Sequence, residues 1–251
     1  MRVLTATNAS KGWLTMKALE ALNKISDLCA RQKGLFTSAQ AQEAGISRTT
    51  LTRLATYNQI IPVTRGVYRA ATAPSLREEP VYAAWLSLDP KTPAWKRTLD
   101  NTSYVVCRQT AAWLYGFDEF DVKPYTFASS ERKQTRNKDI HLFKHEIKPE
   151  DVTALDGLPV LKRQCVAIEL LKHCADTQAV ITFLNALDPE ERPRNMMRLL
   201  SYRETKFSKT DAILIRQNCW KWKTDNGVKI HIFPTEIKEV DSFEDEPLFE
   251  D

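Results

Sequence analysis

The sequence predicts an α+β protein: an N-terminal winged helix-turn-helix, then a mixed α/β domain, then a C-terminal extension with a β-hairpin. Three observations predict this class. Near the start of the chain, a helical apolar pattern leads into a glycine turn and a second short helix. Helical and strand patterns then alternate as far as residue 187, and an Asp-Asn-Gly turn later separates two strand-like runs. The expected units are residues 1–72, 76–187, 188–235 and an acidic, disordered tail at 236–251.

The first expected helix covers residues 15–33. Its apolar side chains recur at helical spacing, with Thr15 suited to cap the first turn and Gly34 suited to end the helix. A helix-turn-helix follows between Leu35 and Leu54. This motif needs a small residue where its two helices touch, which is Ala41, and a glycine in the turn, which is Gly45. Ser47 can cap the second helix. The apolar residues expected to point inward are Ile46, Leu51 and Leu54.

The outward face of the second helix carries arginine and threonine, and no acidic residue lies between Ile46 and Ala73. A surface that approaches phosphate has this composition, although a solvated helix face is the alternative. The run Ile60–Arg69 predicts a β-hairpin with a tight turn at Thr64–Gly66, which is the wing. The candidate contacts to double-stranded DNA are Ser47, Arg48, Thr49, Thr52, Arg53, Thr64, Arg65 and Arg69.

A small-residue linker at 70–75 leads to the second domain. Helices are expected at Glu78–Leu88, Gln109–Tyr115, Arg163–His173 and Thr177–Leu187, and strands at Tyr104–Cys107, Pro124–Ala128, Ile140–His145 and Leu158–Leu161. The segment Ser130–Lys138 is a strongly basic loop between two strands. It is either a solvated loop or a second basic surface for phosphate or an acidic partner, formed by Arg132, Lys133, Arg136 and Lys138.

Several runs resemble the AbiEi family of antitoxins, from type IV toxin–antitoxin (abortive-infection) systems. In the first domain they are Gly-Leu-Phe-Thr-Ser-Ala-Gln-Ala, Gly-Ile-Ser-Arg and, at 65–69, Arg-Gly-Val-Tyr-Arg. In the second they are Ala83–Leu88, Val105–Gly116 and Asp151–Val160, the last resembling a strand pair. The resemblance covers roughly residues 30–187, and Cys107 stands where the family commonly has Ser or Ala.

The resemblance implies a transcriptional repressor that binds inverted repeats upstream of its own gene and counteracts a nucleotidyltransferase-type toxin. It implies that the second domain carries the toxin-antagonising role, without naming residues. Nucleotidyltransferase chemistry itself needs a Gly-Ser turn and an Asp-x-Asp pair, and this domain has neither. The chain is therefore expected to have no catalytic residues. An orphan regulator without a toxin has the same binding surface and stays an alternative.

The C-terminal extension is expected to hold a short helix around residues 196–203 and a hairpin over 220–233. A three-residue loop at 225–227 would place Trp220 opposite Ile232 and leave the apolar residues on one face. Another alternative is a magnesium-dependent nuclease that uses Asp225, Glu236 and Lys238.

The composition excludes several other classes of protein. No apolar run is long enough for a membrane helix, and no signal-peptide pattern opens the chain. The five cysteines are widely spaced, which favours reduced thiols in a cytoplasm and no metal site. The seven glycines are scattered, whereas a phosphate-binding loop for a nucleotide needs clustered glycines, so no cofactor is expected.

Overall fold

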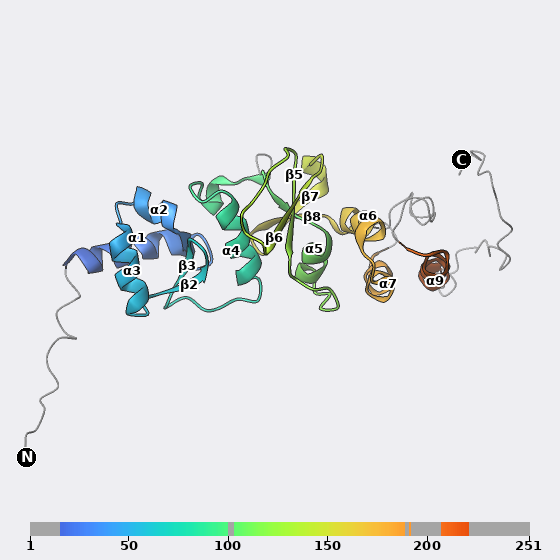
Figure 1. The fold of residues 1–251 in the computed structure, drawn as a ribbon, viewed down its shortest axis with the longest axis horizontal. Coiled ribbons are helices and arrows are strands. Elements are labelled where there is room, and N and C mark those ends of the chain that lie inside the picture. The colour runs from blue at the N-terminus through green and yellow to red at the C-terminus, as the bar shows by residue number, and fades with distance from the viewer. Residues whose placement is uncertain (1–15, 100–102, 189–190, 192–206, 221–251) are drawn as a thin grey trace, which may run out of the picture.

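The computed structural model of the protein describes residues 16–99, 103–188, 191 and 207–220 (Figure 1). It is a mixed α+β structure with two sheets, as the sequence predicts. The first sheet has three strands in the order β1-β3-β2, and the second has five in the order β6-β5-β4-β8-β7.

The N-terminal unit, residues 16–70, runs as helix, strand, two helices and a β-hairpin. Its elements are α1 (Met16–Ala30), β1 (Leu35–Thr37), α2 (Ser38–Glu43), α3 (Arg48–Thr56), β2 (Ile60–Thr64) and β3 (Val67–Ala70). Strand β3 lies between β1 and β2 and pairs antiparallel with both. A capping box begins α2, because the Thr37 side chain accepts a hydrogen bond from the Gln40 amide and the Gln40 side chain accepts one from the Thr37 amide.

The core of this unit forms where its helices meet the sheet. Ile25, Phe36, Leu54 and Ile60 are almost fully buried in one cluster. Ala41 is fully buried in the same cluster, as expected for the small residue where the helices touch. Gly45 has a φ of 82°, in the left-handed region that glycine adopts without strain, so it forms the turn between α2 and α3.

Two details of the N-terminal unit differ from the sequence prediction. The first helix ends at Ala30 rather than at residue 33, and the turn that follows holds Lys33 and Gly34 at φ 53° and 81°. Strand β1 is not predicted by the sequence, because its three residues are all buried and show no alternation between apolar and polar side chains. The expected N-cap, Thr15, lies outside the described residues.

The second unit is built on the five-stranded sheet. Its elements are α4 (Glu79–Leu88), β4 (Val105–Val106), α5 (Arg108–Leu114), β5 (Tyr125–Ser129), β6 (Ile140–Lys144), β7 (Val152–Leu155), β8 (Leu158–Leu161), α6 (Arg163–His173) and α7 (Thr177–Asn185). The pairs β4–β8 and β5–β6 are parallel, whereas β4–β5 and β7–β8 are antiparallel. The sheet is therefore mixed, and the resemblance correctly implied the late strand pair β7–β8.

Helix α4 lies between the two sheets, as Figure 1 shows. Its Val81 and Trp85 are almost fully buried, and they share one cluster with Leu35 and Val67 of the three-stranded sheet. The N-terminal sheet thus contributes side chains to the core of the second unit. A domain boundary between residues 72 and 76 stays a prediction, since apolar packing continues across it.

Buried polar side chains also join the two units. The side-chain oxygen of Gln32 accepts a hydrogen bond from the Ala94 amide at 2.8 Å, and its side-chain nitrogen bonds the Gln40 side chain at 2.9 Å. Gln40 in turn donates to the Thr92 carbonyl at 3.4 Å. Because Gln32 and Gln40 are 0% and 2% exposed, these bonds satisfy groups that would otherwise be costly to bury. The segment 89–97 therefore holds α2 in a defined orientation.

An ion pair at the same junction makes stability depend on pH. The Lys33 Nζ lies 2.5 Å from Glu78 Oε1. Burial opposes ionisation of Glu78, but the hydrogen bond and charge of Lys33 outweigh it and hold the pKa of Glu78 below its ordinary value. A carboxyl with a depressed pKa adds stability above its unfolded pKa and loses that contribution as the pH falls through its folded pKa.

Glu78→Gln is therefore expected to lower the free energy of unfolding by about 1 kcal/mol at neutral pH. The difference from the natural chain should disappear in acid, where Glu78 itself becomes protonated. Urea unfolding of both chains across the acid range measures this. Glu119→Gln, at an exposed glutamate, is the matched control and should leave the curve unchanged. An equal loss at every pH would show that the carboxylate charge is not responsible.

In the C-terminal extension, the structure describes a helix that includes residue 220, where the sequence predicts a strand. Helix α9 (Lys209–Trp220) follows the buried Phe207 and packs through Ile215 into the larger core cluster. The prediction that Trp220 begins a hairpin strand is wrong, because this residue ends α9. The rest of the predicted hairpin, the short helix at 196–203 and the acidic tail lie outside the described residues.

Candidate nucleic-acid interface

Helix α3 is anchored by two apolar residues and capped by a serine. Leu51 and Leu54 are 2% and 1% exposed and fix which face of α3 points inward. The Thr50 amide donates to Ser47 Oγ at 3.1 Å, which confirms the predicted N-cap. The opposite face, formed by Arg48, Thr49, Thr52, Arg53 and Thr56, is exposed. The spacing of the two leucines therefore decides which residues of α3 face outward.

The arginines of this face are available to an outside partner. Arg48 and Arg53 are exposed, and neither takes part in an ion pair within the residues that the structure describes. Arg48 is the first residue of α3, beside the free amides of the helix start. The N-terminal end of α3 is thus electropositive by both its side chain and its backbone.

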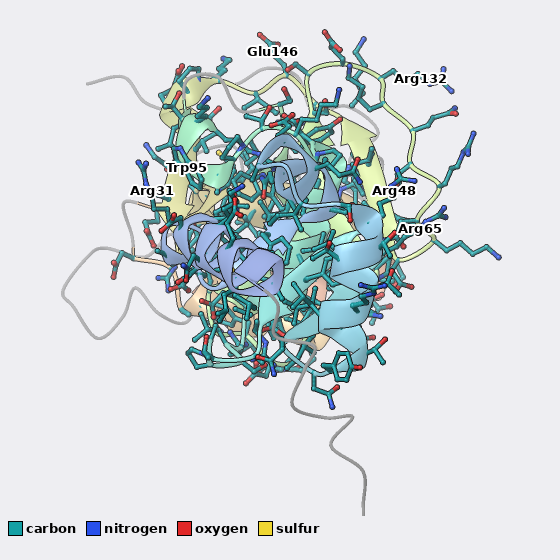
Figure 2. All side chains as sticks on the ribbon, turned by 90° about the vertical axis from the view of Figure 1, so that its left-hand side faces the viewer. Arg31, Arg48, Arg65, Trp95, Arg132 and Glu146 are labelled. Carbon is teal, nitrogen blue, oxygen red and sulfur yellow. The ribbon has the colours of Figure 1, made fainter. Side chains whose placement is uncertain are left out.

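The β2–β3 turn presents a third arginine. Gly66 has a φ of 78°, and its carbonyl accepts the Ser38 amide at 2.8 Å, which holds the turn against the start of α2. Arg65 is exposed at the tip, beside the half-buried Thr64. Figure 2 shows Arg48 and Arg65 on one side of the molecule, away from Arg31 and Trp95. The helix and the turn therefore offer cations toward the same side.

Arg69 behaves differently from the other predicted contacts. Its Nε lies 2.8 Å from Glu79 Oε2, its Nη1 donates to the Ala73 carbonyl, and its side chain is 13% exposed. The guanidinium thus joins the N-terminal sheet to the start of α4. The sequence could not reveal this, because Glu79 lies ten residues further along the chain. Arg69 is therefore engaged within the protein and does not belong to the exposed arginine surface.

The basic loop of the second unit is exposed at all four predicted cations, Arg132, Lys133, Arg136 and Lys138. Figure 2 shows Arg132 on the same side of the molecule as Arg48 and Arg65. Lys133 is partly compensated, because its Nζ lies 2.5 Å from Glu131 Oε2 and that hydrogen bond raises its pKa. Arg132, Arg136 and Lys138 have no such partner among the described ion pairs.

The four cysteines that the structure describes have thiols with raised pKa values. Burial raises the pKa of Cys29 to about 11 and that of Cys107 to about 12, so both thiols are protonated at neutral pH. Burial also raises the pKa of Cys165 and Cys174. Since the thiolate is the nucleophile, none of these four thiols is activated for nucleophilic attack.

The residues that the structure describes hold neither a cluster of metal ligands nor a membrane helix. They contain no group of three or more histidine, cysteine, aspartate or glutamate side chains that could hold a metal ion. None of their helices has the length and apolar character needed to cross a bilayer. The residues of the nuclease hypothesis, Asp225, Glu236 and Lys238, lie outside the described residues.

Comparison with known proteins finds one similarity, and it lies within the N-terminal unit and the residue that follows it. A family model described as "Transcriptional regulator, AbiEi antitoxin" matches residues 23–71, which run from within α1 to just past β3. The match includes α3 and the β2–β3 turn but not the basic loop of the second unit. A search of curated proteins finds no match. Over residues 23–71, the chain is therefore similar to a family of AbiEi antitoxin transcriptional regulators.

Proposed function

We propose that the protein is a DNA-binding antitoxin that represses its own operon in the cytoplasm and counteracts a nucleotidyltransferase-type toxin. The observation that carries the DNA-binding part is a set of three exposed arginines, Arg48, Arg53 and Arg65, on α3 and the neighbouring turn. None of the three forms an ion pair with the residues that the structure describes. All three lie within the segment that matches the regulator family.

The N-terminal unit acts as a winged helix. Helix α3 enters the major groove, where its first turns reach base edges, and the β2–β3 hairpin is the wing. Arg65 at the wing tip contacts the backbone or the minor groove. Ser47, Arg48, Thr49, Thr52, Arg53 and Thr64 complete this contact surface.

The basic loop of the second unit gives a second contact to DNA phosphates beyond the winged helix. The shared side of Arg132, Arg48 and Arg65 in Figure 2 supports this placement. Such contacts are independent of sequence and add affinity that decreases with salt. The operator is a pair of inverted repeats upstream of the gene for this protein, and the second unit opposes the toxin.

The test combines binding and rescue with the full chain. Fluorescence anisotropy should show binding to a duplex from directly upstream of its own gene, far tighter than to a shuffled duplex of equal length. Co-expression should restore growth to cells that produce the toxin from the neighbouring gene. Binding to the upstream duplex without rescue of growth would mean that the protein is a transcriptional regulator but not an antitoxin. Equal affinity for both duplexes would remove the repressor role.

A further inference from the structure

The exposed threonines of α3, which are Thr49, Thr52 and Thr56, use their hydroxyl groups in two different ways. Thr52 Oγ1 donates to the Arg48 carbonyl at 3.0 Å, and Thr56 Oγ1 donates to the Thr52 carbonyl at 2.9 Å. Both are bonds to the carbonyl four residues earlier, a pattern open to threonine inside a helix. The hydroxyl proton of each residue is therefore used by the helix itself.

Thr49 lies on the same exposed face and has no such bond in the described structure. The reason is its position, because the residue four places earlier is Gly45, in the turn before α3. No helical carbonyl is available there to take its proton. The hydroxyl of Thr49 consequently remains free to donate to a ligand.

These two states differ in what they can offer to a base in the major groove. A free hydroxyl can donate to the acceptors of guanine, adenine or thymine. A hydroxyl whose proton is held by the backbone has lost that donor, and its oxygen is drawn against the helix. What Thr52 then offers to a base is chiefly its methyl group, and the matching feature of DNA is the C5-methyl of thymine.

We propose that α3 reads its operator with two chemistries, a hydrogen bond donated by Thr49 and an apolar contact between the Thr52 methyl and a thymine methyl. This inference rests on the proposed function, since it assigns roles within the same DNA-binding surface. It makes Thr49 and Thr52 specificity-determining residues of opposite kinds. Arg48 lies one turn before Thr52 on the same helix face.

Matched substitutions at the two positions separate the two chemistries. Valine keeps the methyl and removes the hydroxyl, whereas serine keeps the hydroxyl and removes the methyl. Thr52→Ser should weaken binding about fourfold, the value of one buried methyl group, while Thr52→Val stays close to the natural chain. Thr49→Val should weaken binding about tenfold, the value of a lost hydrogen bond, while Thr49→Ser is tolerated.

The DNA probe is a duplex that the full chain selects from a random-sequence library, so the operator need not be known beforehand. Each thymine in it is replaced in turn by deoxyuridine, which lacks only the C5-methyl. One replacement should weaken binding of the natural chain about fourfold. The same replacement should not weaken binding of Thr52→Ser further, because the contact is already lost.

The outcomes separate this inference from the proposed function. Failure to select any sequence from the library overturns both. Selection of a site at which no deoxyuridine weakens binding overturns the methyl contact alone. Loss of binding in Thr52→Val with tolerance of Thr52→Ser reverses the assignment, because the hydroxyl would then be the group that is read. Circular dichroism melting of the four variants confirms that they fold like the natural chain.

Discussion

The double substitution Arg48→Ala/Arg53→Ala is expected to lower the affinity for the duplex selected from the random-sequence library about hundredfold. The reason is that each arginine that reads a guanine edge contributes about 1–3 kcal/mol. Both side chains are exposed and lack an ion-pair partner among the described residues, so their loss breaks no ion pair in that part of the chain. The expected loss is larger for the selected duplex than for a shuffled one, because base contacts carry the discrimination.

Anisotropy titrations at several salt concentrations measure this effect. Arg31→Ala is the matched control, because Arg31 stacks on Trp95, 4.7 Å from the ring centroid, away from the proposed surface (Figure 2). Arg132→Ala/Arg136→Ala should instead weaken binding to both duplexes equally and reduce the salt dependence by about two phosphate contacts. If Arg48→Ala/Arg53→Ala binds within about threefold of the natural chain, α3 is not the element that reads DNA.

Arg97→Met is expected to lower the free energy of unfolding by about 3 kcal/mol, because it removes a half-buried guanidinium that donates hydrogen bonds to several carbonyls. Arg97 donates to the carbonyls of Trp85 at 2.9 Å, Leu86 at 3.2 Å and Thr92 at 3.0 Å. It also donates to the carbonyl of Asp89, the C-cap of α4. Two of these acceptors lie in the last turn of α4, whose carbonyls have no partner within the helix.

The charge of Arg97 persists at neutral pH. Burial lowers its pKa to about 10, and the nearby Asp89 opposes that shift. Its guanidinium carbon also lies 4.4 Å from the Trp85 ring centroid, so the cation faces the aromatic ring. The positive charge is therefore stabilised by the helix end and an aromatic face rather than by a direct carboxylate contact.

Urea unfolding of Arg97→Met, with Arg97→Lys beside it, measures this contribution. Lysine keeps the charge but lacks the planar set of five donors, so Arg97→Lys should fall between the other two chains. A loss below about 1 kcal/mol in Arg97→Met would mean that water replaces the guanidinium at these carbonyls.

Most elements of the fold follow from local sequence signals. Helix α3 is a clear case, because Gly45, Ser47 and the spacing of Leu51 and Leu54 specify its turn, cap and inward face. The β2–β3 hairpin follows equally from its glycine turn. Strand β1 does not follow from a local signal, because its three consecutive buried residues show no alternation between apolar and polar side chains. The pattern around the later Asp-Asn-Gly turn predicts a strand at Trp220, whereas this residue ends helix α9.

The sequence by itself determined which side chains of α3 and the wing are free to meet a partner, because the period of a helix and a glycine turn fix the outward face locally. Only the tertiary structure decided that Arg69 is taken by Glu79 and that Arg132 lies on the side of Arg48. It also decided that Gln32 and Gln40 bind the segment after α4. These facts depend on how separate elements of the chain pack together, which no local period records.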